Sequence, residues 1–154
     1  MKRSRITGRL MLVIFVTGSA VLWSLTPTRA EDTAKASSKM FHFDDKDYSI
    51  MKTGGHGSVD IAEYVKTPNM TAGFARWKKG EALTKWPYWY EETVYITKGQ
   101  GRITVYHAPF TDQQIHEVKP GDMLFFAKGS QVTFEATTDQ PLELLYVTTP
   151  DPLP

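Results

Sequence analysis

Beyond residue 40, the chain alternates between apolar and polar positions over short segments, the pattern expected of half-buried β-strands. Turn sequences rich in Gly, Pro, Asn and Asp separate these segments, and no helical period is seen among them. A short strand followed by a turn is expected within 41–50. The other predicted strands are 59–65, 70–77, 93–97, 102–107, 114–118, 123–126, 131–136 and 142–148. About eight short strands without helices predict an all-β sandwich or barrel.

Composition limits the size of the fold and the classes of partner. The chain has 154 residues, of which 41% are hydrophobic and 12% aromatic, enough for one domain with one buried core. Its 18 Lys and Arg residues nearly balance 17 Asp and Glu residues, for a formal net charge of +1. Because no bulk charge favours a polyanion, a nucleic-acid partner is not expected.

The first thirty residues have the pattern of a secretory signal peptide. A basic start is followed by an apolar run over about 10–25 and by Thr28-Arg29-Ala30, which resembles a cleavage site. An uncleaved anchor is the alternative, but the run is interrupted by polar residues and is short for a membrane span. We therefore expect a signal peptide over 1–30, a flexible segment over 31–40 and a β-domain over 41–150. The mature protein is expected in the periplasm or secreted, without membrane contact after cleavage.

One segment concentrates aromatic and acidic side chains. Residues 79–101, KGEALTKWPYWYEETVYITKGQG, place four aromatic rings directly before Glu91 and Glu92. If Glu92 points into the domain, strand alternation directs Val94 and Ile96 inward as well, and leaves one carboxyl group in a mostly apolar interior. An unpartnered buried carboxylate is costly. Glu92 should therefore pair with Arg76, accept a hydrogen bond from Tyr88, or stay protonated.

The spacing of this segment resembles the first motif of the cupin family, a jelly-roll β-barrel. That motif has a glycine, two histidines, a glutamate and a second glycine; the matching positions here are Gly80, Trp86, Tyr88, Glu92 and Gly99. A second cupin motif is matched by Gly121, Ala127-Lys128-Gly129, Val132 and Ala136. The resemblance covers roughly 70–148 and implies a cupin-type jelly-roll barrel in which the motif histidines are replaced.

The resemblance also identifies the family's four metal-ligand positions, which here are Trp86, Tyr88, Glu92 and Val132. Only Glu92 is an ordinary donor for a transition metal. The remaining histidines lie outside the motifs, at positions 42, 56, 107 and 116. We expect neither a catalytic metal nor another cofactor, although a loop histidine such as His56 or His107 could supply a replacement ligand.

Two classes of function follow. The preferred interpretation is a binding module that holds a small organic molecule in an aromatic-lined barrel pocket, through Trp86, Tyr90, Arg76, Val132 and Phe134. The alternative is a metal-independent isomerase, lyase or hydrolase with Glu92 and Tyr88 as acid and base. A metal-dependent cupin dioxygenase is disfavoured by the missing histidines. The same rings could also be packed core.

An observable property of the carboxyl group separates the first two interpretations. A raised pKa of Glu92 would favour the enzyme, and neutralisation of Glu92 by an arginine would favour the binding module.

A narrower resemblance comes from the stretches PYWYEETVYITKG and KPGDMLFFAKGS. They are similar to the ethanolamine-utilisation-type subgroup and other small cupins that lack the metal-binding histidines. Those relatives are cytosolic or lie in protein compartments, whereas the signal sequence here implies export. The resemblance to cupins also implies that two copies can pair through their sheets to form a homodimer.

Overall fold

A computed structural model describes residues 38–149, and from Met40 onward they form one unit. The predicted signal peptide over 1–30 and most of the predicted flexible segment over 31–40 lie outside the described residues. Within 38–149, no helix is long and apolar enough to cross a membrane.

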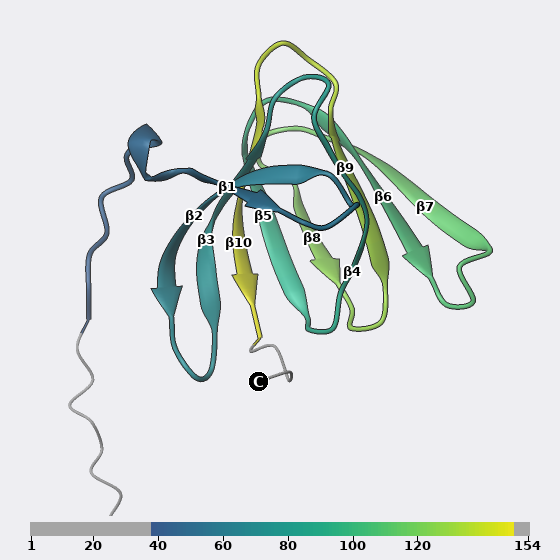
Figure 1. Ribbon diagram of the computed structural model, residues 1–154, viewed down its shortest axis with the longest axis horizontal. Helices are drawn as coiled ribbons and strands as arrows, with labels where there is room; N and C mark the ends of the chain where they lie inside the picture. The colour runs from purple at the N-terminus through teal and green to yellow at the C-terminus, as the bar shows by residue number, and fades with distance from the viewer. Residues whose placement is uncertain (1–37, 150–154) are drawn as a thin grey trace, which may run out of the picture. The chain divides into compact units, whose positions relative to one another are not determined.

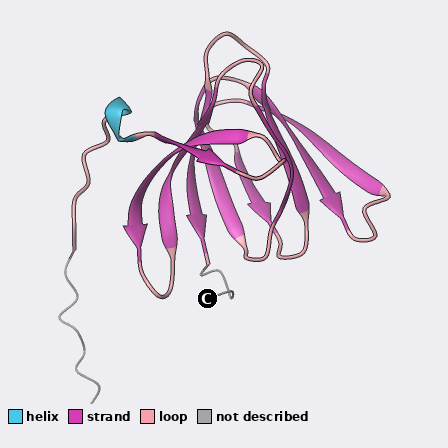
Figure 2. Cartoon of the chain, viewed as in Figure 1, coloured by secondary structure: helices cyan, strands magenta, loops and turns pink. Residues whose placement is uncertain are grey.

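The described chain is almost entirely β-structure (Figure 2). One short 3₁₀ turn, η1, precedes the strands and is shown in cyan in Figure 2. The elements are η1 (Asp45–Asp47), β1 (Ser49–Lys52), β2 (Ser58–Lys66), β3 (Thr71–Trp77), β4 (Ala82–Pro87), β5 (Glu92–Lys98), β6 (Gly101–His107), β7 (Asp112–Val118), β8 (Met123–Phe126), β9 (Gln131–Ala136) and β10 (Leu142–Thr148). The all-β prediction is confirmed.

The strands form two antiparallel sheets (Figure 1). The larger sheet has the order β1-β2-β3-β10-β5-β8, and the smaller has the order β4-β9-β6-β7. Strands far apart in sequence are neighbours in both sheets, since β10 lies between β3 and β5, and β9 lies between β4 and β6. The last strand therefore completes the centre of the larger sheet.

Apolar side chains on the facing surfaces of the two sheets make the core. Trp77 of β3 stacks on Phe134 of β9, with ring centroids 4.7 Å apart and planes 3° from parallel. Along β5, Val94 and Ile96 are fully buried, whereas Tyr95 is 40% exposed. The predicted alternation after Glu92 is confirmed.

Two strands differ from the sequence prediction. In 41–50, the expected strand followed by a turn is instead η1 followed by the start of β1. The sequence analysis also missed β4, which has the sequence ALTKWP. A shift in its pairing with β9 between Leu83 and Trp86 breaks the two-residue alternation, so the strand carries no clear period.

Gly99 and Gly101 flank the turn between β5 and β6 for different reasons. Gly99 has a φ of 70°, which favours glycine. Gly101 has no positive φ. Instead, a Cβ atom there would lie 2.6 Å from the Glu135 carbonyl oxygen on β9. Close approach of the backbones, together with the side chain of Leu142, excludes any larger residue at Gly101.

Candidate functional site

A cavity of about 220 Å³ lies among the inward-facing side chains of the larger sheet, β4 and β9. Its buried wall contains Trp77, Leu83, Tyr88, Phe134 and Leu144. Its more exposed wall carries half-buried aromatic and aliphatic residues and the exposed Glu63. The full lining is Met51, Val59, Ile61, Glu63, Thr71, Ala75, Trp77, Leu83, Trp86, Tyr88, Tyr90, Glu92, Phe134, Leu144, Tyr146 and Thr148.

Tyr88 and Glu92 form a hydrogen-bonded pair in this wall. The Tyr88 hydroxyl donates to Oε1 of Glu92 at 2.7 Å, and both residues are less than 10% exposed, at 3% and 7%. Backbone bonds hold Tyr88 in place: its N–H donates to the Ser130 carbonyl at 2.9 Å, and its carbonyl accepts from the Gly129 N–H at 2.7 Å. The second-motif turn thus positions a first-motif side chain.

Hydrogen bonds to the end of β10 also hold the start of β5 in place. The Glu91 N–H donates to Oγ1 of Thr149 at 3.0 Å, and the Glu91 carbonyl accepts from the Thr149 N–H at 3.0 Å. Glu92 then pairs with Thr148 on β10 and with Phe126 on β8. Because strands on both sides hold its backbone, Glu92 cannot swing outward without opening the sheet.

Burial controls the protonation of this pair. Desolvation raises the pKa of Glu92 to about 7, and the hydrogen bond from Tyr88 opposes that rise. Burial and the adjacent Glu92 carboxylate raise the pKa of Tyr88 well above its ordinary value. Near neutral pH, Tyr88 is therefore a proton donor in a hydrogen bond, and the Glu92 carboxyl group is close to half ionised.

Trp86 reaches the cavity because β4 contains an irregularity. Leu83 and Trp86 both line the cavity although they are three residues apart, which a regular strand does not allow. The pairing with β9 shifts between them, and Lys85 adopts a φ of 47°. The Lys85 N–H donates to Oγ1 of Thr133 at 2.9 Å and holds the bend. The Trp86 indole N–H then meets the Tyr90 hydroxyl at 3.4 Å.

The sequence analysis missed four polar residues of the wall, Glu63, Thr71, Tyr146 and Thr148. Two of them, Glu63 and Tyr146, are ionisable. Tyr146 on β10 lies opposite Gly73 on β3, where a Cβ atom would lie 2.8 Å from the Tyr146 hydroxyl. Burial raises the pKa of Tyr146, and the carboxylates of Glu63 and Glu92 add to that rise. Alternation could have revealed Glu63, since it lies on one face with Val59 and Ile61 in strand 59–65.

Trp77, which also lines the cavity, has a buried polar atom. It is 2% exposed, and its Nε1 has no hydrogen-bond partner among the described residues. A buried indole N–H normally finds an acceptor.

Arg76 was predicted to bind the ligand, and pairing with Arg76 was one of three alternatives for Glu92; the structure places Arg76 away from both. Arg76 is not among the residues of the cavity wall, because it follows Ala75 on β3 and points to the opposite face of the sheet. There its guanidinium lies 3.3 Å from Asp45 and 3.4 Å from Asp60. It also covers the ring of Tyr48 at 3.8 Å.

The other predicted ligand-binding residues divide into two groups. Trp86, Tyr90 and Phe134 line the cavity together with Tyr88 and Glu92. Val132 is fully buried but is not part of the cavity wall. It pairs with Trp86 on one side and Val105 on the other, so its side chain fills the core between them.

The metal-ligand positions of the first motif therefore meet in the cavity without their histidines. Within 38–149, no three His, Asp or Glu side chains are grouped so that they could hold a metal ion. His56 contacts the aromatic segment: its ring lies edge-on to Trp86, with the ring centroids 5.7 Å apart. Its Nδ1 lies 2.9 Å from the Thr84 carbonyl oxygen.

Comparison with known proteins identifies the family. Residues 69–139 match the family model described as the EutQ-like cupin domain. These residues are a cupin domain. The match covers both glycine-framed motifs and the strands between them, and it supports the resemblance to the EutQ-type subgroup. Comparison with the curated proteins gave no match.

Solved structures show the same cupin fold. The EutQ protein of Clostridium difficile is 20% identical, with 73% of this chain and 82% of that chain covered and a TM-score of 0.53. A predicted oxalate decarboxylase from Thermotoga maritima is 18% identical, with coverage of 71% and 98% and a TM-score of 0.56. The CENP-C domain of Drosophila melanogaster is 15% identical, with coverage of 66% and 72% and a TM-score of 0.55. At these identities the likeness concerns the fold alone.

Proposed function

We propose that this cupin binds a small organic molecule in the cavity between its sheets, without a catalytic metal. The observation that carries the proposal is the convergence of Trp86, Tyr88, Tyr90 and Glu92 on one cavity of about 220 Å³. Pockets for drug-sized ligands span roughly 300–1,000 Å³. The cavity here is smaller, so we expect a ligand smaller than a drug-sized molecule. Aromatic walls with a few fixed polar groups are typical of such sites.

Ligand-observed NMR with a library of small neutral, anionic and cationic compounds tests this proposal. Ala75 lines the cavity, so Ala75→Leu fills part of it, and Ala127→Leu on an exposed turn is the matched control. We expect compounds that bind the wild type and the control but not Ala75→Leu, with all three proteins folded. If every compound that binds also binds Ala75→Leu equally well, the cavity is not the site.

A second candidate is turnover by acid–base catalysis, and the pKa of Glu92 favours it. A general acid or base works best when its pKa lies near the working pH, and burial raises the pKa of Glu92 to about 7. No arginine neutralises Glu92 among the described residues, since Arg76 pairs elsewhere. A raised pKa of Glu92 without an arginine partner is the property expected of an enzyme, so turnover is the second candidate.

Incubation of the compounds found by NMR in deuterium oxide separates the two candidates. An enzyme that moves a proton will exchange a C–H for a C–D bond or form a product, and Glu92→Gln will abolish that change. A binding module will leave every bound compound unchanged over days. The control Glu91→Gln alters an exposed neighbour and should behave as the wild type does.

Export is also proposed, on the strength of the basic start and apolar run of residues 1–30. N-terminal sequencing of protein from the periplasm or the medium should find a chain that begins close to Glu31. Full-length chain in the cytosol, with Met1 in place, would contradict export.

A further inference from the structure

The ionisable residues of the cavity wall are all acids. Glu63, Glu92, Tyr88, Tyr90 and Tyr146 line the cavity, and no described residue of the wall is Lys, Arg or His. Tyrosine is neutral at physiological pH, so the wall can carry negative charge and no positive charge. An anionic ligand would meet two carboxyl groups without a cation to balance its charge.

The aromatic rings of the wall also suit a cation. Indole and phenol faces carry negative partial charge and attract ammonium groups, most strongly where water is excluded. Trp86, Tyr88 and Tyr90 come from one short segment, and their rings differ in orientation, with Tyr88 and Tyr90 inclined by 68°. Trp77 and Tyr146 line the wall from β3 and β10. Aromatic rings from several elements thus border one small volume.

The two carboxyl groups come from different elements and differ in their exposure. Glu92 is buried at the start of β5, whereas the Glu63 side chain on β2 is 40% exposed. Tyr146 lines the same cavity, and both carboxylates contribute to its raised pKa. Within the described part of the chain, Glu63 pairs with Lys66, whose Nζ lies 3.6 Å away on a side chain that is 76% exposed. Such an exposed ion pair is weak and can give way to a bound cation.

We propose that the cavity selects a small organic cation, an amine or quaternary ammonium compound, held by aromatic faces with Glu92 and Glu63 as its counter-charges. This inference rests on the proposed small-molecule function and adds the chemical class of the ligand. A neutral molecule of the same shape keeps the ring contacts but loses the attraction to the carboxylates and the ring faces.

A pair of compounds with the same shape tests the charge directly. Choline and 3,3-dimethylbutan-1-ol differ in one atom, the nitrogen that carries the positive charge. Titration calorimetry with the full-length protein, at about pH 8, should give a dissociation constant at least tenfold lower for choline. Equal affinities would overturn cation selection and leave the small-molecule pocket standing. If neither compound binds, cation selection is likewise overturned, and the neutral and anionic compounds of the NMR library still test the pocket.

Charge variants then identify the groups that recognise the cation. Glu92→Gln and Glu63→Gln should each weaken choline binding severalfold or more. Their matched controls, Glu91→Gln and Glu117→Gln, remove exposed carboxylates outside the cavity wall and should leave it unchanged. If the controls weaken binding as much as the cavity variants do, the attraction is a general surface effect and the proposal is wrong.

Lys66 gives a test with the opposite sign. Lys66→Met removes the competing cation beside Glu63 and should strengthen choline binding about two- to fivefold. The control Lys79→Met removes an exposed lysine that pairs with Asp139 at 2.8 Å, away from the cavity wall, and should have no effect. Weaker choline binding by Lys66→Met would contradict the role given to Glu63.

Discussion

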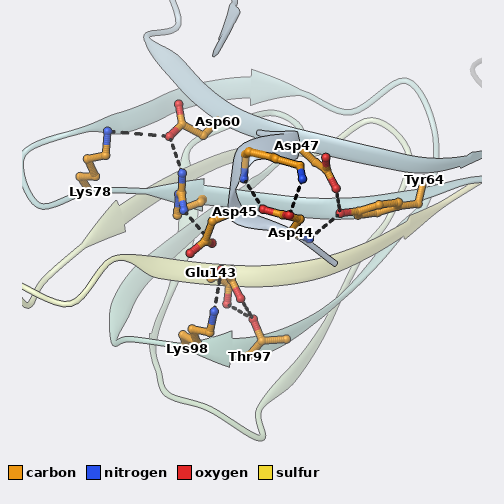
Figure 3. Close-up of polar contacts among 11 residues, drawn as sticks. Asp44, Asp45, Asp47, Asp60, Tyr64, Lys78, Thr97, Lys98 and Glu143 are labelled. Atoms are coloured by element: carbon orange, nitrogen blue, oxygen red, sulfur yellow. Dashed lines mark hydrogen bonds and ion pairs between the residues drawn. The ribbon is translucent and has the colours of Figure 1, made fainter. Parts of the chain in front are cut away.

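Two buried glutamates on neighbouring strands have different surroundings on opposite faces of the larger sheet. Glu92 on β5 is 7% exposed and Glu143 on β10 is 3% exposed. On the outer face, Glu143 accepts from Oγ1 of Thr97 at 2.9 Å and pairs with Nζ of Lys98 at 3.3 Å (Figure 3). On the inner face, Glu92 accepts a hydrogen bond from Tyr88, and within 38–149 it forms no ion pair.

The difference assigns the two carboxyl groups to different tasks. Glu143 has a cation, so it joins β10 to β5 on the outer face. Segment 41–48 also packs on the larger sheet: Phe43 packs on Phe74 at 4.7 Å, and Asp44 and Asp47 form hydrogen bonds with Tyr64 (Figure 3). Glu92 has a cavity where Glu143 has a lysine. A buried acid without a cation weakens the folded state, and such groups are concentrated at functional sites.

The largest expected effect is on how stability depends on pH. The folded-state pKa of Glu92, about 7, exceeds its ordinary value of 4.5, so protonation favours the folded state and stability is lost as pH rises between these values. Glu92→Gln mimics the protonated form at every pH. The free energy of unfolding of Glu92→Gln should therefore be about equal to that of the wild type near pH 4. Near pH 8 it should be higher by roughly 3 kcal/mol.

Urea denaturation of both proteins at the two pH values measures this difference. Glu91→Gln removes an exposed carboxylate one residue away and should follow the wild type at both values. A stability difference between Glu92→Gln and the wild type that does not change with pH would show that Glu92 ionises as an exposed residue does.

Glu143→Gln should have a smaller effect and the opposite sign. It removes the charge that Lys98 balances and should lower the free energy of unfolding by about 1 kcal/mol. Loss of a fully buried pair would lower it more, but Lys98 is half exposed. Ligand affinity should not change, since Glu143 lies outside the cavity wall. Glu117→Gln breaks the exposed pair with Arg102 and is the control, with almost no effect on stability expected. If Glu143→Gln alters ligand binding instead, the two faces are not independent.

Tyr88→Phe sharpens the comparison by removing the polar partner of Glu92. The hydroxyl stabilises the ionised carboxylate, so its loss should raise the pKa of Glu92 further and cost about 1 kcal/mol of stability above neutral pH. An NMR titration of ¹³C-labelled glutamate carboxyl groups measures the pKa directly. Tyr95→Phe, on the outward side of β5, should leave it unchanged. A lower pKa in Tyr88→Phe would contradict the hydrogen bond to the carboxylate.

The sequence predicted most of the fold because turn residues and two-residue alternation are local signals. Strand alternation also predicted that Val94 and Ile96 share the face of Glu92, and the bond with Tyr88 was one of the three alternatives for that carboxyl group. The sequence prediction failed at β4, where a bulge hides the alternation, and in 41–50, where a short segment gains its structure by packing on the sheet. Neither a bulge nor packing on a distant strand can be predicted from turn residues and two-residue alternation.

The site was predicted only in part because contacts between distant strands leave little trace in one sequence. Arg76 was one of three alternatives for Glu92 and was counted among the ligand-binding residues, whereas alternation from Ala75 places it on the other face. In strand 142–148, the run LELL is apolar on both sides of Glu143, so its period does not show which residues point inward. Tyr146 therefore passed unnoticed.

The smallest expected effect is that of removing metal ions, which should leave the stability of the protein unchanged. A bound transition metal would give Glu92 the cation that Lys98 gives Glu143, and would remove the contrast between them. The donor set argues against it, since Tyr88 keeps its proton and the other motif positions are Trp86 and Val132. Elemental analysis of the purified protein should find far less than one equivalent of iron, manganese, nickel or zinc, and treatment with a chelator should leave thermal unfolding unchanged. One equivalent that is lost in Glu92→Gln but kept in Glu91→Gln would place a metal at Glu92 and overturn the metal-free site.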